Sequence, residues 1–482
     1  MSITATQAPS SAISSSSSTI PSSPAPSRFG YACGLACREC GHTCELGAQH
    51  ACSECFGPLE VSYDLPHLTR ELIEAGPQNI WRYKSLLPVP SDVGQTRNTE
   101  PGCTRLVHAG NLASELGMRS LWVKDERGNP THSFKDRVVA VALAASIEMG
   151  FKVLACPSTG NLANAVAAAA ARAGIRSVVL VPGDLEPQKI IGTAVYGGTL
   201  VTVQGSYDDV NRLASELADE HPDWAFVNVN VRPYYAEGSK TIGYEIAEQL
   251  GWRLPGQVVV PVASGAQLVK IDKAFRELSE LGLVDGPAPA VFGAQATGCS
   301  PVAAAFRAGH DVVQPVRPDT IAKSLAIGNP ADGPYVLDVV RRTGGAVADV
   351  TDAEIVDGIR LLARTEGIFG ETAVGTTLAV LRQLLASGQL DPGAETVIIN
   401  SGDGLKTLDA VASAAPSDPP IRATLAAFAE FESSRSGKPG SSRSGQPGSS
   451  RSGQPGSSRS GQPGSSRSGQ PGSSPSGKAA AA

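Results

Sequence analysis

The stretch Val153-Leu154-Ala155-Cys156, followed by Pro157-Ser158-Thr159-Gly160-Asn161 and by an alanine-rich run from Ala163 to Ala173, decides the fold. The first four residues are typical of a short buried strand, and the serine and glycine of the next five indicate a turn. The alanine run carries only Asn164 and Arg172 as polar interruptions and predicts a packed helix. Together they form a strand–loop–helix unit.

The same unit recurs along the middle of the chain. Seven further strands are predicted at Leu121–Lys124, Ser177–Val181, Leu200–Val203, Ala225–Val229, Val258–Val262, Val291–Ala294 and Thr396–Ile399. Repeated units of this kind build parallel sheets with helices on both faces, so the fold class is α/β. Ligands bind such sheets at the carboxyl ends of the strands. Functional residues are therefore expected in the loops that follow the strands.

Composition narrows the class of protein. The 482 residues are 41% hydrophobic and 18% charged, which suits two to three folded domains. The net charge is −6, but the segment from Ser433 holds seven basic residues and no acid, so the remainder carries −13. An acidic folded part predicts no nucleic-acid partner. No apolar run is long enough for a membrane span, and scattered cysteines without a signal peptide predict the cytoplasm.

Both ends of the chain differ from the middle. Residues 1–30 form a Ser/Pro-rich leader, and residues 433–482 repeat the octapeptide Ser-Ser-Arg-Ser-Gly-Gln-Pro-Gly with small variations. Such compositions cannot bury a core, so both ends are expected to be disordered. The function of the repeats is left open.

Six of the nine cysteines lie between Cys33 and Cys55. Cys37-x2-Cys40 and Cys52-x2-Cys55 form two knuckles whose four thiolates can close a tetrahedral zinc site in a segment too small to fold alone. A structural Zn²⁺ in a ribbon over residues 31–62 is therefore predicted, with disulfides or free thiols as the alternatives. Nearby Cys33, Cys44, His42 and His50 are spare ligands.

One lysine stands at a strand-to-helix transition. After the strand Leu121–Lys124 and a turn at 128–130, Ser133 is a plausible N-cap, which places Lys135 in the first turn of a helix that runs to about Met149. A cation there opposes the helix dipole, which favours the neutral amine that imine chemistry requires. From its position alone, an ordinary solvated lysine is the simpler interpretation.

Three loops after other strands could surround a ligand. The loop Ser158-Thr159-Gly160-Asn161 offers backbone amides and hydroxyls to a carboxylate at a helix start. The small residues of Ala263-Ser264-Gly265-Ala266-Gln267 let backbone amides approach a phosphate. Ser401, in the loop after Thr396–Ile399, offers a hydroxyl to a ring nitrogen. Each loop by itself is equally consistent with a plain turn.

Together, and in this order, these pieces resemble the threonine synthase family of fold-type II pyridoxal-phosphate (PLP) enzymes. The resemblance spans nearly all of residues 34–412, and the run Asn129-Pro130-Thr131-His132-Ser133-Phe134-Lys135-Asp136 is its most characteristic part. Further matching segments are Cys52–Val61, Pro157–Asn161, Tyr234–Thr241, Ile321–Pro330, Glu366–Ala373 and Gly402–Thr407.

The resemblance implies a PLP-dependent carbon–oxygen lyase that acts on phosphates and converts O-phospho-L-homoserine and water into L-threonine and phosphate. It implies that Lys135 binds the cofactor as an imine and acts as the catalytic base. Asn161 would meet the ring hydroxyl, Ala263, Ser264, Gly265, Ala266 and Gln267 the cofactor phosphate, and Ser401 the ring nitrogen. The fold it implies is two three-layer α/β domains within residues 63–432, the smaller over about 135–240, in a homodimer.

Some residues at the positions expected to bind the substrate depart from the family pattern. Ser158, Thr159 and Gly160 are expected to bind the substrate, but Leu162 stands where a threonine is often found. Tyr235 stands where an arginine often binds the substrate phosphate.

Two nearby cations could compensate for these departures. They are Arg232 and Lys189, the latter with a surface lysine as an equal alternative. Another lyase or synthase of this fold, such as a serine/threonine dehydratase or cysteate synthase, and a non-catalytic PLP-binding relic are the alternatives. The sequence leaves allosteric regulation open.

Overall fold

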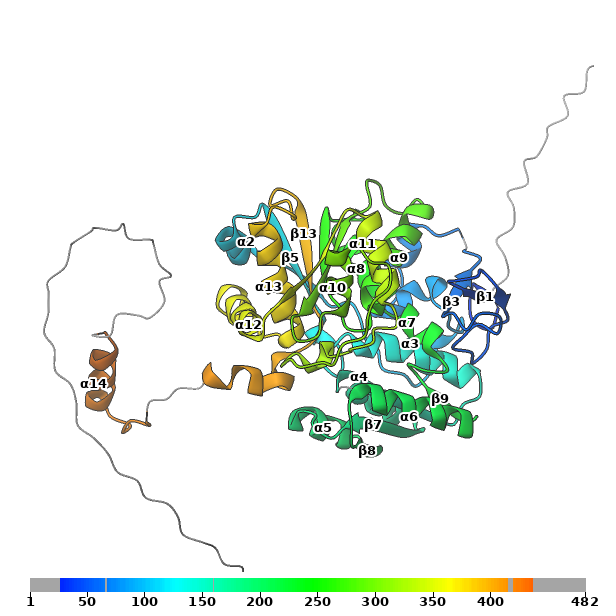
Figure 1. The fold of residues 1–482 in the computed structure, drawn as a ribbon, viewed down its shortest axis with the longest axis horizontal. Coiled ribbons are helices and arrows are strands. Elements are labelled where there is room, and N and C mark those ends of the chain that lie inside the picture. The colour runs from blue at the N-terminus through cyan, green and yellow to red at the C-terminus, as the bar shows by residue number, and fades with distance from the viewer. Residues whose placement is uncertain (1–26, 66, 159, 415–418, 437–482) are drawn as a thin grey trace, which may run out of the picture. The chain divides into compact units, whose positions relative to one another are not determined.

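The computed structural model describes residues 27–65, 67–158, 160–414 and 419–436 (Figure 1). The chain divides into two compact units, Met1–Ala415 and Pro416–Ala482. Of the second unit, helix α14 (Leu425–Ser436) is described. Residues 1–26 of the predicted leader and 437–482 of the predicted tail lie outside the described part.

The predicted boundaries of the two tails shift slightly. Phe29 is fully buried, so the last residues assigned to the leader pack onto the folded unit. Helix α14 reaches Ser436, so the first residues assigned to the tail are helical. The compact unit ends at Ala415, short of the boundary expected at 432.

The first unit contains a six-stranded sheet in the order β12-β11-β10-β13-β5-β4. Five strands are parallel, and only β4 runs antiparallel to its neighbour β5. The strands are β4 (Arg105–His108), β5 (Ser120–Asp125), β10 (Gln257–Pro261), β11 (Ala290–Ala296), β12 (Val347–Val350) and β13 (Glu395–Asn400).

Helices cover both faces of this sheet because alternate residues of its strands point to opposite sides. Ile398 packs toward α2 (Gly110–Leu116), α12 (Asp352–Glu366) and α13 (Thr372–Ala386). Its neighbours Val397 and Ile399 pack toward the opposite layer. That layer consists of α8 (Lys240–Gln249), α9 (Ala266–Glu280), α10 (Pro301–Ala308) and α11 (Gly333–Arg342).

A second, four-stranded parallel sheet has the order β8-β7-β6-β9. Its strands are β6 (Val153–Pro157), β7 (Arg176–Pro182), β8 (Thr199–Val203) and β9 (Trp224–Phe226). Leu154 and Cys156 face α3 (Lys135–Glu148) and α4 (Asn161–Ala173). Val153 and Ala155 face α6 (Tyr207–Glu220). All eight predicted strands are present, while β4 and β12 were not predicted.

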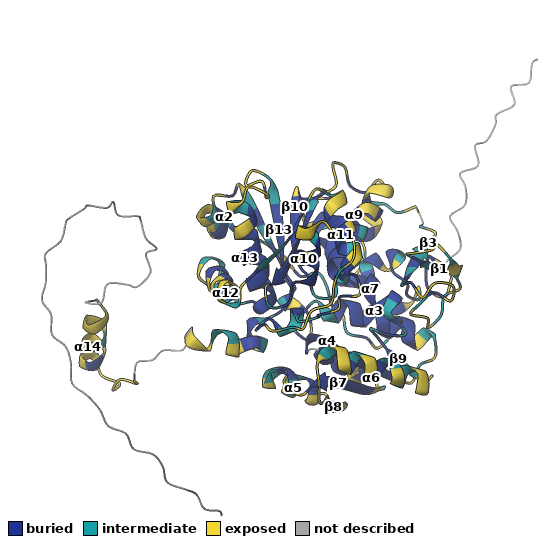
Figure 2. Cartoon of the chain, viewed as in Figure 1, coloured by how far each residue is buried: buried dark blue, intermediate teal, exposed yellow. Residues whose placement is uncertain are grey.

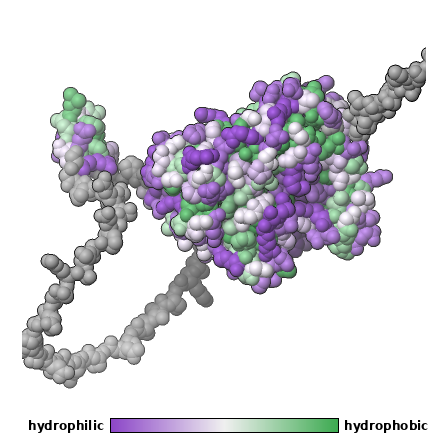
Figure 3. Space-filling model, turned by 90° about the horizontal axis from the view of Figure 1, so that it is seen from above, coloured by the Kyte–Doolittle hydropathy of each residue, from purple (hydrophilic) through white to green (hydrophobic). Residues whose placement is uncertain are grey.

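Short elements complete the unit. They are α1 (Arg70–Glu74), α5 (Pro187–Ala194), α7 (Arg232–Glu237) and the 3-10 turns η1 (Ile80–Leu86), η2 (Val93–Gln95), η3 (Glu126–Gly128), η4 (Lys323–Leu325) and η5 (Gly404–Ala414). The inner strands of both sheets, such as β6 and β10, are buried, while the outer helix faces are exposed (Figure 2). Small hydrophobic areas are separated by hydrophilic ones on the face in Figure 3. None of the helices in the described residues is long and apolar enough to cross a membrane.

The cysteine-rich segment forms a small antiparallel sheet of β1 (Ala32–Cys37), β2 (Thr43–Cys44) and β3 (Leu59–Tyr63), in the order β2-β1-β3. We call residues 31–62 the ribbon. Its apolar residues, among them Leu35 and Val61, belong to the same buried cluster as the helix packing around α3 and α4. The ribbon therefore shares the core of the larger fold and does not stand apart from it.

A cluster of buried charges joins the ribbon to the helices beneath it. We call it the ribbon ion cluster; its members are Glu60, Glu237, Lys240, Lys270, Lys273 and Glu277. Glu237 lies at its centre, 2.7 Å from Lys240, and also accepts a hydrogen bond from Tyr63, the last residue of β3. Burial opposes the charge on Glu237, but the surrounding lysines outweigh it and hold its pKa well below the ordinary value.

Candidate active site

A cavity of about 440 Å³ lies where the carboxyl ends of strands from both sheets converge. Its wall includes loops that follow β6, β10 and β13, as expected for parallel sheets. The predicted site residues on this wall are Lys135, Ser158, Asn161, Arg232, Ala263, Ser264, Gly265, Ala266, Gln267 and Ser401. Gly160 and Lys189 do not line it, and Thr159 lies outside the described residues.

Lys135 is the first residue of α3, but the predicted cap is wrong. The N-cap is Phe134, without a side-chain bond, and the Ser133 hydroxyl has no partner. The segment before the helix is held instead by the backbone of the Ser401 loop, where Phe134 N–H donates to the Ser401 carbonyl. The residue before Lys135 is thus bonded to the loop after β13.

The Lys135 amine points into the cavity and donates to the hydroxyl of Tyr235 over 2.9 Å. Burial lowers the pKa of this amine to about 8, although the nearby carboxylate of Glu371 acts in the opposite direction. A lysine with such a pKa is partly neutral near physiological pH. It can therefore act as a nucleophile and as a base.

Asn161 and Ser401 both contact a carboxylate that the sequence did not single out. The Asn161 amide donates to both oxygens of Glu371, at 3.1 and 2.8 Å, and the Ser401 hydroxyl donates to one of them over 3.1 Å. The Lys406 amine donates to the side-chain amide oxygen of Asn161 over 3.0 Å. Glu371 and Lys406 therefore orient Asn161 at the edge of the cavity.

The small-residue loop after β10 forms a cradle at the start of α9. Gly265 has φ +99°, and a Cβ there would meet a Val336 methyl at 2.7 Å, so only glycine fits without a shift. The amide nitrogen of Gln267 faces this region without a hydrogen-bond partner among the described residues. The loop leaves backbone amides and this side chain free to bind an anion.

The predicted substrate residues fall into two groups. The Ser158 hydroxyl accepts from the backbone of Gly160 and Ala163, both over 2.9 Å, so it caps α4 besides lining the cavity. Arg232 lines the cavity and pairs with Asp332 at 2.5 Å.

Lys189 is fully buried, 3.1 Å from Glu186, with its chain against Gly160. The surface alternative is therefore wrong for Lys189: its aliphatic chain packs against Gly160, and its amine pairs with Glu186.

Sequence reasoning missed Glu371, Lys406, Asp332 and the lysine-binding role of Tyr235. Glu371 and Lys406 lie in segments that carry the family resemblance, so the sequence alone could have marked these two positions as candidates. Their contacts could not be predicted, because each meets Asn161 from more than 200 positions away in the chain. Only the folded arrangement brings them together.

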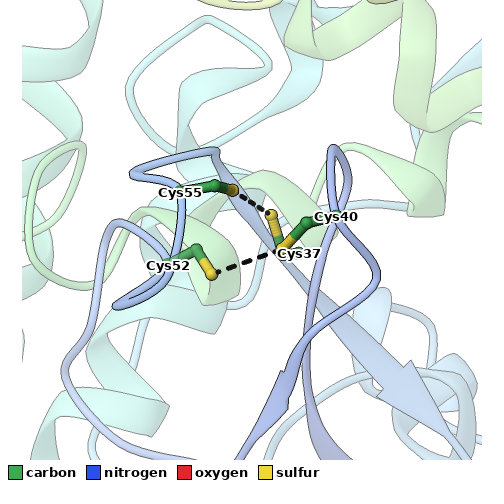
Figure 4. A group of neighbouring side chains, drawn as sticks. All are labelled: Cys37, Cys40, Cys52 and Cys55. Carbon is green, nitrogen blue, oxygen red and sulfur yellow. Dashed lines mark hydrogen bonds between the residues drawn. The ribbon is translucent and has the colours of Figure 1, made fainter.

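The four predicted zinc ligands form a second site (Figure 4). The sulfur atoms of Cys37, Cys40, Cys52 and Cys55 all lie within 4.8 Å of one another. Cys37 and Cys52 are buried, while Cys40 and Cys55 are exposed. Among the described residues this is the one group of three or more His, Cys, Asp or Glu side chains close enough to hold a metal ion. The spare candidates Cys33, Cys44, His42 and His50 do not belong to it.

The cavity lies at the carboxyl ends of strands from two helix-covered sheets, and its wall carries a lysine whose amine is available to a carbonyl cofactor. This arrangement defines an α/β enzyme of the fold-type II class. The family model described as "Pyridoxal-phosphate dependent enzyme" matches residues 98–402. The chain belongs to this family and, within it, to the threonine synthase family.

Known relatives and structures agree with this assignment. The chain is 38% identical to the threonine synthase of Methanocaldococcus jannaschii over 80% of its own length and 95% of that protein. It is 36% identical to that of Methanosarcina acetivorans, over 77% and 92%. The structure of maize serine racemase is similar with a TM-score of 0.53 at 20% identity, over 69% of this chain and 94% of that one, which shows the shared fold.

The residues present fit a bound PLP. Lys135 supplies an amine with a lowered pKa, and the loop 263–267 supplies a glycine cradle beside an unpartnered amide. Asn161 and Ser401 supply polar side chains on the same wall. These features match an aldehyde, a phosphate and a polar aromatic ring in one ligand.

Proposed function

We propose that this chain is a threonine synthase that converts O-phospho-L-homoserine and water into L-threonine and phosphate. The observation that carries the proposal is the 38% identity to a threonine synthase over 95% of that protein's length. The convergence of Lys135, Asn161, Ser401 and the loop 263–267 on one cavity supports it.

In this proposal the chain holds PLP by four contacts. Lys135 binds the aldehyde carbon, the loop 263–267 binds the phosphate, Asn161 binds the ring hydroxyl, and Ser401 binds the ring nitrogen. When bound, PLP supplies an electron sink that stabilises negative charge on the substrate carbons. Because Ser401 is a neutral hydroxyl, it does not hold the ring nitrogen protonated.

The Lys135 amine is the proton carrier of the reaction. With a pKa of about 8, it is neutral often enough to take the proton from the substrate α-carbon and to help move one at the β-carbon. The bond from the γ-carbon to the phosphate oxygen breaks, and the γ-carbon gains a proton in place of the one lost from the β-carbon. A water oxygen bonds to the β-carbon, the α-carbon regains its proton, and the proton released by the water leaves with the phosphate. Tyr235 accepts a hydrogen bond from this amine and thereby holds it on the cavity wall whenever it is free.

The substrate end supports a second candidate as well. Arg232 and Lys135 are the two cationic side chains on the cavity wall among the described residues, and Asp332 partly neutralises Arg232. A weak phosphate site favours a serine/threonine dehydratase of the same fold, whose substrate carries no phosphate. In the threonine synthase proposal, the substrate phosphate competes with Asp332 for the Arg232 guanidinium.

Three incubations of the purified holoenzyme distinguish these functions. Phosphohomoserine should yield phosphate and threonine in equal amounts, while threonine alone, or phosphoserine with sulfite, should be left unchanged. Conversion of threonine alone to an oxoacid and ammonia would make the chain a dehydratase. A cofactor absorbance band without turnover of any substrate would indicate a non-catalytic PLP-binding protein. Lys135→Ala is the control and should abolish both the band of the lysine-bound cofactor and turnover.

We further propose that Cys37, Cys40, Cys52 and Cys55 bind a structural Zn²⁺. The closeness of the four sulfur atoms supports this, since four thiolates satisfy a tetrahedral zinc site. One zinc per chain by elemental analysis, lost on Cys40→Ser substitution, is the expected result.

The remaining proposals rest on the family resemblance. They are two α/β domains, the smaller over about 135–240, and a homodimer. The proposed cytoplasmic location rests instead on the scattered cysteines. Sedimentation of the purified chain tests the dimer.

A further inference from the structure

The second knuckle of the ribbon lies on the wall of the active-site cavity. His50, Ala51, Phe56 and Pro58 line the same cavity as Lys135 and the loop 263–267. These residues surround Cys52 and Cys55, two of the proposed zinc ligands. The ribbon is therefore more than an attached stabilising module, because it supplies part of the cavity surface.

Phe56 is the most unusual residue of this knuckle. Its side chain is 83% exposed, and its backbone has φ +59°, a conformation that a bulky residue adopts at a cost. The knuckle turn imposes this conformation, since Phe56 N–H donates to the Cys52 carbonyl and Cys52 N–H to that of Gly57. An aromatic ring held in this way, uncovered, at a cavity wall is suited to cover a ligand inside.

The first knuckle does not line the cavity but contacts Tyr335 of α11. The Arg38 guanidinium lies 3.5 Å from the ring centre of Tyr335, and the Tyr335 hydroxyl donates to Glu39. Tyr335 lies in the first turn of α11, whose N-cap is Asp332. Asp332 pairs with Arg232 in the cavity, and its backbone N–H donates to the Ser264 carbonyl of the cradle over 2.8 Å.

The base of the ribbon is anchored independently of the cysteines. Glu60 of β3 pairs with Lys270 and Lys273 of α9 in the ribbon ion cluster. Loss of a metal ion would therefore release the knuckles at 37–40 and 52–55, while β3 stays bound to α9. The knuckles are the parts whose shape depends on the four thiols.

We infer that the second knuckle forms a substrate-binding wall, with Phe56 as a specificity-determining residue whose position the bound metal fixes. The inference rests on the proposed function and on the proposed zinc site. Phe56 covers the open side of the amino-acid phosphate, and Tyr335 transmits the position of the first knuckle to Arg232 through Asp332. The metal itself takes no part in the chemistry.

The test compares Phe56→Ala with Leu72→Ala in the holoenzyme. Leu72 is also an exposed apolar residue, at 62%, but it lies in α1 and not on the cavity. Phe56→Ala should raise KM for phosphohomoserine about tenfold, equivalent to one lost aromatic contact, with kcat within about twofold of the parent. Zinc and PLP contents should stay unchanged, and Leu72→Ala should behave as the parent.

A second arm removes the metal from the folded holoenzyme with a chelator. KM should rise at least as much as in Phe56→Ala, and the affinity for L-threonine, titrated by its effect on the cofactor absorbance, should fall in parallel. PLP content should be retained, and added Zn²⁺ should restore both values. An unchanged KM in Phe56→Ala, or in folded zinc-free enzyme, would overturn the inference.

Failure of the proposed function itself would look different. The parent enzyme would then not turn over phosphohomoserine, and the same variants would be compared by the amino acid that does shift the cofactor band. A binding loss in Phe56→Ala, absent in Leu72→Ala, would still support the wall. Equal binding in both variants would overturn it.

Discussion

Replacing Tyr235 by phenylalanine tests whether this residue holds the catalytic amine. The substitution keeps the buried ring but removes the hydroxyl that accepts from Lys135 over 2.9 Å. A hydrogen bond that involves a charged group contributes about 1.5–3 kcal/mol, which corresponds to roughly 10- to 150-fold in rate. Because the amine would no longer be held on the cavity wall, kcat should fall by roughly 10- to 150-fold.

The pH profile separates positioning from simple packing. Activity should rise as the pH passes through the Lys135 pKa of about 8, because only the neutral amine accepts a proton. Without the hydroxyl, the charged amine loses an acceptor, so its pKa falls and the rising limb moves to lower pH.

The experiment records kcat as a function of pH for the parent, Tyr235→Phe and Tyr207→Phe. Tyr207 also lines the cavity, but its hydroxyl bonds to Asn228 and not to Lys135, so its limb should stay in place. If kcat of Tyr235→Phe equals that of the parent, or falls while the limb stays at the same pH, the reasoning about Tyr235 is refuted.

Two further predictions concern buried carboxylates. Glu371→Gln replaces the acceptor that orients Asn161 and Ser401, so the dissociation constant of PLP, measured by absorbance titration, should rise about tenfold; unchanged affinity would contradict its orienting role. Glu237→Gln removes the central charge of the ribbon ion cluster and leaves buried lysines without it, so the free energy of unfolding in urea should fall by about 3–5 kcal/mol. Glu216→Gln, in an exposed pair on α6, is its control and should cost less than about 1 kcal/mol.

Local sequence patterns were sufficient for the buried strands. Runs such as Val258–Val262 and Thr396–Ile399 are short, β-branched and followed by small residues, and each forms a strand of a parallel sheet. The sequence did not predict the strands β4 and β12. They lie at the two edges of their sheet and carry charged residues, so their hydrophobic pattern is weaker. The N-cap at Ser133 failed because a distant loop binds the backbone there, which no local pattern encodes.

The sequence by itself predicted which residues would carry the chemistry. These residues lie in local patterns, namely the run around Lys135, the three small-residue loops and the paired knuckles. Each pattern can be recognised from neighbouring residues, without knowledge of the fold. Only the tertiary structure decided their contacts: the hydrogen bond from Lys135 to Tyr235, the burial of Lys189, the carboxylate of Glu371 between two loops, and the ribbon on the cavity wall. The physical reason is that hydrogen bonds, burial and pKa depend on distances between atoms, and residues far apart in the chain acquire those distances only when their elements pack.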